Sequence, residues 1–297
     1  MSVPSDAFAA VRALRTRARA VPLVTIMAVL LGVTGATTAA AQDDARPDLT
    51  FGSLVDPSAT GATEQLLAVI ERELEELLGR DYAVRFPDAK RRRSDWTSAG
   101  IQRELDLLLG DPEVDVVLVV GPVSTAVLCC TDALPKPVFA PLGIDGEALG
   151  LPAKDDSSGV PNLNYLSNPG ASYRDLAAFV ELAGFKTVHI LSDPGIYDVL
   201  QDLYERNQAA LAPIGITSVP LSVVASADEA LAALPPTTEA VYVTPLLRMT
   251  VAEKKKLFDG LARRGIPTMS LLGRNEVELG AFAGLRKPAD APRMARR

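Results

Sequence analysis

The sequence predicts an α/β protein made of two Rossmann-like lobes, each with a parallel sheet, that face one another across an inter-lobe cleft. From residue 48 onward, strand and helix patterns alternate almost without interruption, which is typical of parallel sheets joined by right-handed crossovers. The run VDVVLVVG at 114–121 is continuously apolar, as expected of a strand that is covered on both faces. A stretch rich in Gly, Pro, Ser and acids, 145–161, interrupts the alternation before it restarts. Because the alternation stops there and then starts again, the sequence predicts two lobes.

Each half contributes its own series of elements. The first half predicts strand 49–56, helix 61–79, strand 82–87, helix 95–109, strand 114–121, a short helix from Ser124 and strand 136–143. After NLNYLS at 162–167, the second half predicts helix 172–183, strand 186–193, helix 196–212, strand 217–223, helix 226–234, strand 239–246, helix 250–264 and strand 266–273.

The first 41 residues have the pattern of a cleaved signal peptide. Arginines precede the apolar segment VPLVTIMAVLLGVTGATTA, and small residues end at Ala41. A transmembrane anchor is the alternative, but the second half of the segment is Gly, Thr and Ala, which favours cleavage. The predicted divisions are a signal peptide at 1–41, an N-terminal lobe at 42–145, a boundary loop at 146–161, a C-terminal lobe at 162–285 and the start of a return segment to the first lobe at 286–297.

The net charge limits the kinds of partner that the protein can bind, and the cysteine content limits its redox chemistry. The chain has a net charge of −7, and removing the leader, with its four Arg and one Asp, leaves −10. This balance argues against nucleic acid or an anionic membrane as a partner. The two cysteines, Cys129 and Cys130, are adjacent. They are expected at the end of a short helix, at least partly buried, and a redox or intermolecular role is the alternative.

The common catalytic and cofactor motifs are absent from the sequence. It contains no dinucleotide or P-loop glycine motif and no G-x-S-x-G elbow. The single histidine, His189, lies inside a predicted strand. We therefore expect no enzyme activity, no cofactor and no metal. The basic run KRRR at 90–93 is interpreted as a solvated stretch, and Trp96 as a residue that packs against the sheet, with a place near the cleft as the alternative.

An Asp-Pro pair follows a strand in each half. Asp56-Pro57 and Asp193-Pro194 each precede a predicted helix, and DVVLVVGPVST at 115–125 matches EAVYVTPLLRMT at 239–250 in pattern. Proline fits the first turn of a helix, and aspartate can cap the free N–H groups there. Because ligands of open α/β sheets bind at the carboxyl ends of the strands, the two pairs are expected to form facing walls of one site.

The second half contains the most specific resemblance. Residues 241–285, VYVTPLLRMTVAEKKKLFDGLARRGIPTMSLLGRNEVELGAFAGL, resemble the second lobe of ABC transporter substrate-binding proteins with the type I periplasmic binding fold, in the family that includes aromatic amino-acid binders. The resemblance implies a monomeric periplasmic protein that closes around a small polar or amino-acid-like ligand and delivers it to an ABC permease in the inner membrane. The chain stops at RMARR, where the family pattern continues, so the C-terminus is either truncated or that of a shortened member.

The resemblance also places the binding residues at strand ends. Hydroxyls at a helix N-terminus are expected to hold a carboxylate, the two aspartates to accept from an amine or hydroxyl, and the tyrosines to stack on an apolar ligand. The alternative is that the aspartates and Ser124 only cap helices and that Arg248 pairs with a surface acid. The expected ligand-binding residues are Asp56, Pro57, Gly121, Ser124, Thr125, Tyr165, Asp193, Tyr197, Thr244, Pro245 and Arg248.

Two other functions compete with solute transport. The same fold serves in a sensory module that presents its ligand-bound state to a membrane receptor. An exported α/β enzyme requires a nucleophile among Ser124, Ser192 and Cys129, with His189 within hydrogen-bond reach.

Overall fold

The structure is a computed structural model that describes residues 46–130, 134–143, 146, 151–154, 157–167, 171–199, 201–223 and 225–284. The expected signal peptide at 1–41 and the return segment at 286–297 lie outside the described residues. In the part of the chain that is described, no helix combines the length and apolar character needed to cross a membrane.

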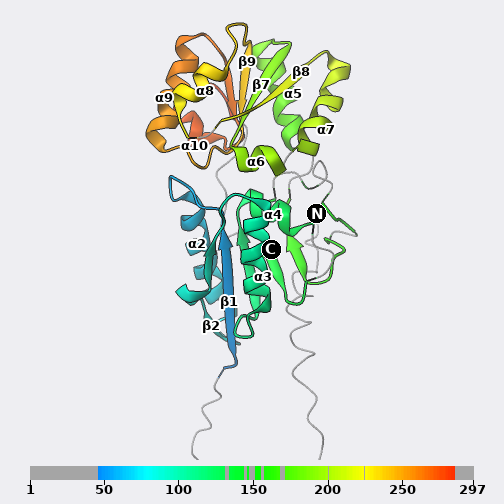
Figure 1. The fold of residues 1–297 in the computed structure, drawn as a ribbon, viewed down its shortest axis with the longest axis vertical. Coiled ribbons are helices and arrows are strands. Elements are labelled where there is room, and N and C mark those ends of the chain that lie inside the picture. Colours follow the sequence, from blue (N-terminus) through cyan, green and yellow to red (C-terminus); the bar gives the residue numbers. More distant parts are fainter. Residues whose placement is uncertain are drawn as a thin grey trace, which may run out of the picture.

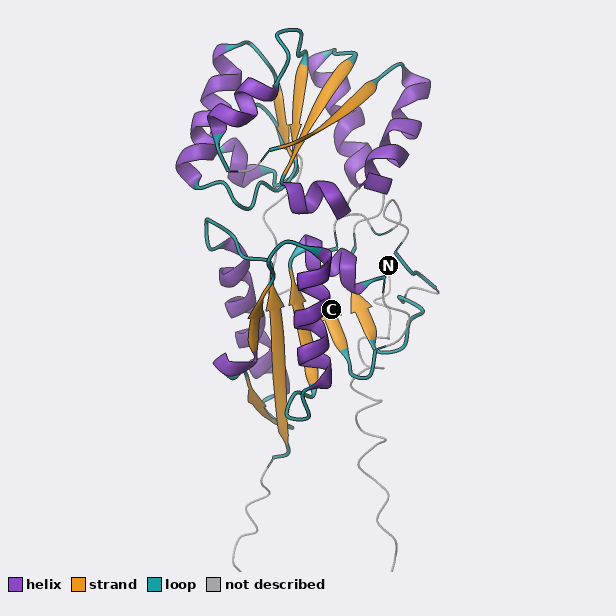
Figure 2. Ribbon diagram, in the orientation of Figure 1, coloured by secondary structure: helices purple, strands orange, loops and turns teal. Residues whose placement is uncertain are grey.

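The described chain forms two α/β lobes, stacked along the long axis of the molecule (Figure 1). In each lobe, helices flank a sheet (Figure 2). The first lobe contains β1 (Asp48–Val55), α2 (Ala62–Leu78), β2 (Ala83–Arg85), η1 (Asp88–Lys90), β3 (Arg91–Arg93), α3 (Ser98–Gly110), β4 (Val116–Val120), α4 (Pro122–Leu128), β5 (Val138–Ala140) and β6 (Leu163–Tyr165). The second lobe contains α5 (Ala171–Ala183), β7 (Thr187–Ser192), α6 (Pro194–Val199), α7 (Gln201–Leu211), η2 (Ala212–Ile214), β8 (Thr217–Ser222), α8 (Ala227–Ala233), β9 (Ala240–Val243), α9 (Val251–Arg263), β10 (Thr268–Ser270) and α10 (Arg274–Val277).

The two sheets share one strand order. The first runs β2-β1-β4-β5-β6, with β3 also beside β1, and the second runs β10-β9-β7-β8. All pairings between these strands are parallel. In each sheet, the first strand lies between the second and the next main strand, so β1 corresponds to β7 and β4 to β9. The predicted fold class is therefore confirmed, and the matched sequence segments occupy equivalent places in the two lobes.

The structure moves one boundary. The predicted division places residues 162–285 in the second lobe, but β6 pairs with β5 in the first sheet through three residues, Leu163 to Tyr165. The second sheet begins only at β7. A three-residue strand is too short for its own periodicity to reveal which sheet it joins.

The basic run at 90–93 includes a strand that the sequence did not predict, although Arg91 and Arg93 remain exposed to solvent as expected. Arg91–Arg93 form β3, which pairs in parallel with Ser53, Leu54 and Val55 of β1. The charges are matched nearby: Arg91 Nη2 lies 2.8 Å from Glu71, and Lys90 Nζ lies 2.6 Å from Asp111. These ion pairs let a basic segment occupy the edge of the sheet, where charged side chains are common.

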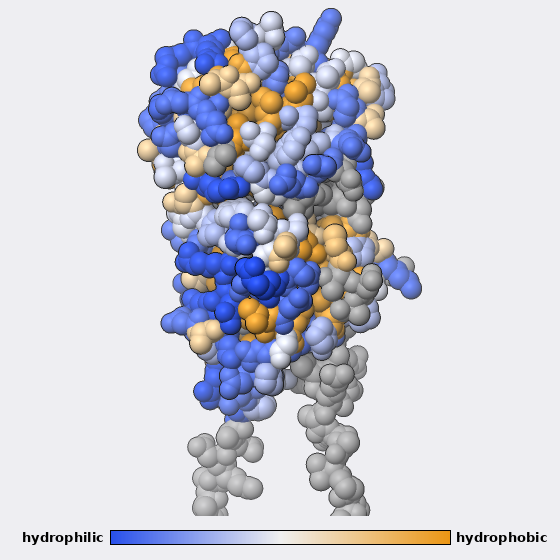
Figure 3. Space-filling view, viewed as in Figure 1, coloured by the Kyte–Doolittle hydropathy of each residue, from blue (hydrophilic) through white to orange (hydrophobic). Residues whose placement is uncertain are grey.

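The cores explain why the apolar runs form strands. Three buried residues of β4, Val117, Leu118 and Val119, are at most 1% exposed because helices cover both faces of the sheet. One apolar cluster runs continuously from Leu54 in the first lobe to Ile196 in the second. Hydrophilic side chains cover much of the surface seen in Figure 3, with apolar patches on both lobes.

Candidate functional site

The carboxyl ends of the two sheets face each other. Beyond β1, the backbone N–H of Ala59 donates to the carbonyl of Leu247, which follows β9, at 2.8 Å. Helix α4, which follows β4, contacts α6, which follows β7, and Figure 1 shows α6 on the side of the second lobe that faces α4. This is the place where the switch-point rule for open α/β sheets puts a ligand. We name it the inter-lobe junction.

Asp56 lies at the first-lobe side of the junction and is fully buried. Its carboxylate accepts hydrogen bonds from the backbone N–H groups of Val123 at 2.9 Å and Ser124 at 3.1 Å. The hydroxyls of Ser94 and Ser124 also donate to it. Burial raises the pKa of Asp56, while the hydrogen bonds from Ser124 oppose that rise. Asp56 therefore caps α4 and has little capacity left for a ligand.

Asp56 caps a different helix from the one expected. The Asp56-Pro57 pair does not open the next helix, because α2 begins only at Ala62. Instead the carboxylate reaches the helix that follows the neighbouring strand. A Cβ at Gly121 would lie 2.2 Å from the Asp56 carboxylate, so only glycine lets α4 start this close to Asp56.

Asp193 occupies the equivalent place in the second lobe and is also fully buried. Its two carboxylate oxygens each accept from Arg248 Nε at 2.9 Å, and the N–H of Gly195 donates to it at 3.2 Å. Arg248 therefore pairs with a buried acid rather than a surface one. Among the described residues, the Nη1 group of Arg248 has no hydrogen-bond partner.

Trp96 meets this ion pair from the first lobe. The Arg248 Cζ lies 5.4 Å from the centroid of the Trp96 ring, within the range of a cation–π interaction. The backbone of Trp96 has φ 69°, a conformation that is strained for a bulky residue and that clusters at functional sites. The sequence reading favoured packing against the sheet. The strand β3 was not predicted from the sequence. Because Trp96 follows β3 at the carboxyl end of the sheet, recognising that strand would have placed Trp96 at the junction.

The remaining expected residues are mostly engaged within the protein. Ser124 and Thr125 are buried, and the Thr125 hydroxyl donates to the Gly121 carbonyl at 2.6 Å. The Thr244 hydroxyl donates to the Leu191 carbonyl at 3.0 Å. Ser124 donates to Asp56. Both hydroxyls at the start of α4 are therefore bonded within the protein, and the prediction that they hold a ligand carboxylate is not supported.

The aromatic candidates fall in two places. Tyr197 is half-buried on α6, with its ring 5.7 Å from that of Tyr204. The hydroxyl of Tyr165, at the end of β6, donates to the Pro152 carbonyl at 2.7 Å. Pro57 is half-buried, and Pro245 is buried. Of the two tyrosines, Tyr197 lies on the helix that reaches the junction.

Among the described residues, no hydrogen bond joins His189 to the nucleophile that the enzyme alternative requires, Ser124, Ser192 or Cys129. His189 is buried in β7 with no hydrogen-bond partner for Nδ1, and burial lowers its pKa. Burial raises the pKa of Cys129 to about 12, which keeps the thiol protonated. Ser192 bonds to Tyr204 rather than to a base. Among the described residues, no group of His, Cys, Asp and Glu is arranged to hold a metal ion.

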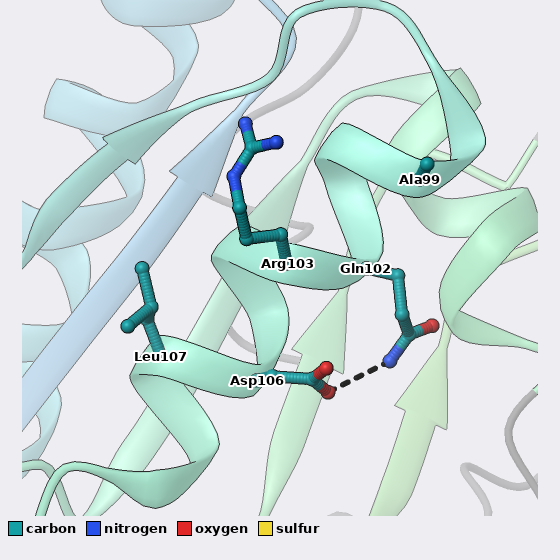
Figure 4. A pocket seen from close by; sticks show the side chains of 5 residues that line it. All are labelled: Ala99, Gln102, Arg103, Asp106 and Leu107. Carbon is teal, nitrogen blue, oxygen red and sulfur yellow. Dashed lines mark hydrogen bonds between the residues drawn. The ribbon is translucent and has the colours of Figure 1, made fainter.

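A surface pocket lies away from these groups, on α3. It has a volume of about 470 Å³ and is lined by Ala99, Gln102, Arg103, Asp106 and Leu107. All five residues belong to the exposed side of one helix, where Gln102 donates to Asp106 at 2.9 Å (Figure 4). A hollow built by one helix holds a ligand from one side only, unlike a typical ligand-binding pocket.

Comparison with solved structures defines the class of fold. An ABC domain from Streptococcus pneumonia in complex with L-Trp aligns with TM-score 0.61 and 17% identity, over 84% of this chain and 81% of that one. A solute-binding protein of an ABC transporter from R. palustris, in complex with benzoate, aligns with TM-score 0.56 and 16% identity, over 78% and 65%. A LacI family transcriptional regulator from Bifidobacterium animalis aligns with TM-score 0.51 and 14% identity, over 83% and 86%.

These alignments show that the chain has the fold of type I periplasmic binding proteins. The same fold in a transcriptional regulator means that the fold alone does not define what the site does. No family model matches the sequence, and a search of curated proteins finds no significant match.

Proposed function

We propose that this chain is the solute-binding component of an ABC-type transport system, and that it binds a small polar or amino-acid-like ligand between its two lobes. The observation that carries the proposal is that the carboxyl ends of two parallel sheets face each other and present side chains from both lobes at one junction. The fold it shares with ABC solute-binding proteins supports the same function. The signal-peptide pattern at 1–41 supports a periplasmic location and delivery to a permease in the inner membrane.

Within the junction, Arg248 and Trp96 are the ligand contacts that we favour. Arg248 is held by Asp193 and keeps free donors on Nη1, which suit a carboxylate or another polar oxygen. Trp96 offers a broad apolar face from the opposite lobe, and Tyr197 lies on the nearby α6. A ligand that touches both lobes stabilises the closed form by its differential affinity for that form.

A thermal-shift panel on residues 42–297 tests this function. The panel contains amino acids, aromatic acids, sugars, nucleosides and oxyanions. A ligand at a hundred times its dissociation constant adds about 2.7 kcal/mol, which raises the melting temperature by several degrees. We expect one chemical class to shift the melt. A sharp melt that no compound moves would contradict a solute-binding role.

Matched variants locate the binding of any compound that shifts the melt. Asp193→Asn combined with Arg248→Met removes both charges of the junction pair, so no buried carboxylate is left unpaired. Arg263→Gln changes an exposed arginine at the end of α9. The proposal expects the thermal shift to be lost in the first variant and retained in the second.

A further inference from the structure

Side chains of the two lobes contact each other directly at the junction. Trp96 of the first lobe lies over Arg248 of the second, and the Ala59 N–H donates to the Leu247 carbonyl at 2.8 Å. None of these contacts needs a third molecule between the lobes.

We propose that Trp96, Gly195, Asp193 and Arg248 form a latch that holds the two lobes together without a bound solute. The latch goes beyond the proposed function, and it does not depend on which ligand the protein binds or on whether it binds one. It is an interaction between the two halves of one chain.

The first part of the latch is a fixed arginine. Asp193 is fully buried and accepts from Arg248 Nε with both carboxylate oxygens at 2.9 Å. The side chain of Arg248 is 31% exposed. Because the ion pair sets the position of the guanidinium before Trp96 meets it, little side-chain freedom is lost when the lobes come together.

The second part is a close fit between Trp96 and α6. A Cβ placed on Gly195 would lie 2.9 Å from the Trp96 carbonyl oxygen and 3.2 Å from its Cβ. Ile196, the next residue, is fully buried in the apolar cluster that runs through both lobes. Glycine at 195 therefore lets the first lobe approach α6 closely enough to bury its neighbour.

The third part is the backbone of Trp96 itself. Its φ of 69° is rare for a bulky residue, and such strain persists only where surrounding contacts hold it. Ser94, two residues earlier, donates to Asp56 at 2.8 Å, and Asp95 accepts from the N–H of Thr97 at 3.0 Å. The residues on both sides of Trp96 are thus anchored in the first lobe while its ring faces the second.

The single tryptophan of the chain makes the latch measurable. Trp96 fluorescence and its quenching by acrylamide report the exposure of this one ring, and X-ray scattering reports the radius of gyration. Both are measured on residues 42–297 with no ligand added, so the outcome is independent of the solute-binding assay.

Gly195→Ala is the main test variant. The added methyl group pushes on Trp96, but alanine suits a helix better than glycine does, so the second lobe keeps its fold. Gly110→Ala is the matched control, because a Cβ there meets nothing within 4 Å. Asp193→Asn with Arg248→Met is a second test, which removes the charged part of the latch and leaves Gly195 in place.

The latch predicts a protected Trp96 in the unmodified chain and in Gly110→Ala. It predicts stronger quenching and a larger radius of gyration in both test variants, since loss of one such contact changes the closed-to-open ratio about five- to thirty-fold. Quenching in the unmodified chain equal to that of free indole would overturn the proposal. So would test variants that fold cooperatively and match the control in both measurements.

Discussion

In the first lobe, Asp56 follows β1 and lies buried against the start of α4, where it accepts from two backbone N–H groups. In the second lobe, Asp193 follows β7, is equally buried, and accepts from one backbone N–H, that of Gly195, and from the side chain of Arg248. The difference arises beyond the neighbouring strand. Only Gly121 separates β4 from α4, whereas residues 244–250 separate β9 from α9. The aspartate of the first Asp-Pro pair thus serves only a helix start, whereas that of the second also positions an arginine at the lobe junction.

Of the changes that test this difference between the two aspartates, removal of Arg248 alone should lower the free energy of unfolding most. Arg248→Met leaves the Asp193 carboxylate buried and unpaired, so the free energy of unfolding falls by about 3 kcal/mol. The double variant Asp193→Asn with Arg248→Met recovers most of that loss, because no charge remains buried. Denaturant unfolding of the unmodified chain, the single variant and the double variant measures these free energies. Equal losses in the single and double variants would mean that the pair contributes through packing and not through charge.

Removing Asp56 gives a smaller loss, and of a different kind. Asp56→Ala leaves two N–H groups of α4 without their acceptor, which costs about 2 kcal/mol. Asp56→Ala also removes the acceptor of Ser94, which anchors the backbone beside Trp96, but it leaves the Arg248–Asp193 pair in place. The exposure of Trp96 to acrylamide should therefore rise less than in the Asp193→Asn with Arg248→Met variant. Denaturant unfolding and fluorescence quenching test the two parts separately. A rise in Trp96 quenching as large as that of the double variant would contradict this difference between the two aspartates.

The smallest effect concerns pH and the buried His189. Burial lowers the pKa of His189, so below about pH 6.5 the unfolded chain binds a proton that the folded chain does not. The free energy of unfolding therefore decreases as the pH falls through that range, by up to about 1.4 kcal/mol per pH unit. His189→Val removes this contribution, and its stability should vary less between pH 6.5 and 5. Parallel stability curves for the two chains would contradict the assignment.

Much of the fold follows from local patterns in the sequence. Long apolar runs and amphipathic periods predict the order of strands and helices, and the matched segments at 115–125 and 239–250 indicate the repeat that the sheets confirm. The short elements do not follow. In the sequence, β3 has only the pattern of a charged run, and β6 was assigned to the second lobe. Three residues are too few to show a period, and the pairing of each strand depends on a distant one.

The site is predictable only in its outline. Strand ends mark where functional residues gather, and Asp56, Asp193 and Arg248 do lie at the two facing ends. Which acceptor meets which donor depends on loop lengths that bring segments far apart in the sequence together. The role of Trp96 depends on β3 and on Gly195, and neither residue pattern signals a contact between lobes on its own.

A ligand site at the inter-lobe junction is tested most directly by titrating Trp96 fluorescence with a compound that raises the melting temperature. Because Trp96 is the only tryptophan and lies at the junction, binding between the lobes must change its surroundings. A ligand site between the lobes predicts a saturable change in Trp96 emission, with the dissociation constant that the thermal shifts give. A compound that stabilises the protein but leaves Trp96 emission unchanged would bind elsewhere and contradict a ligand site at the inter-lobe junction.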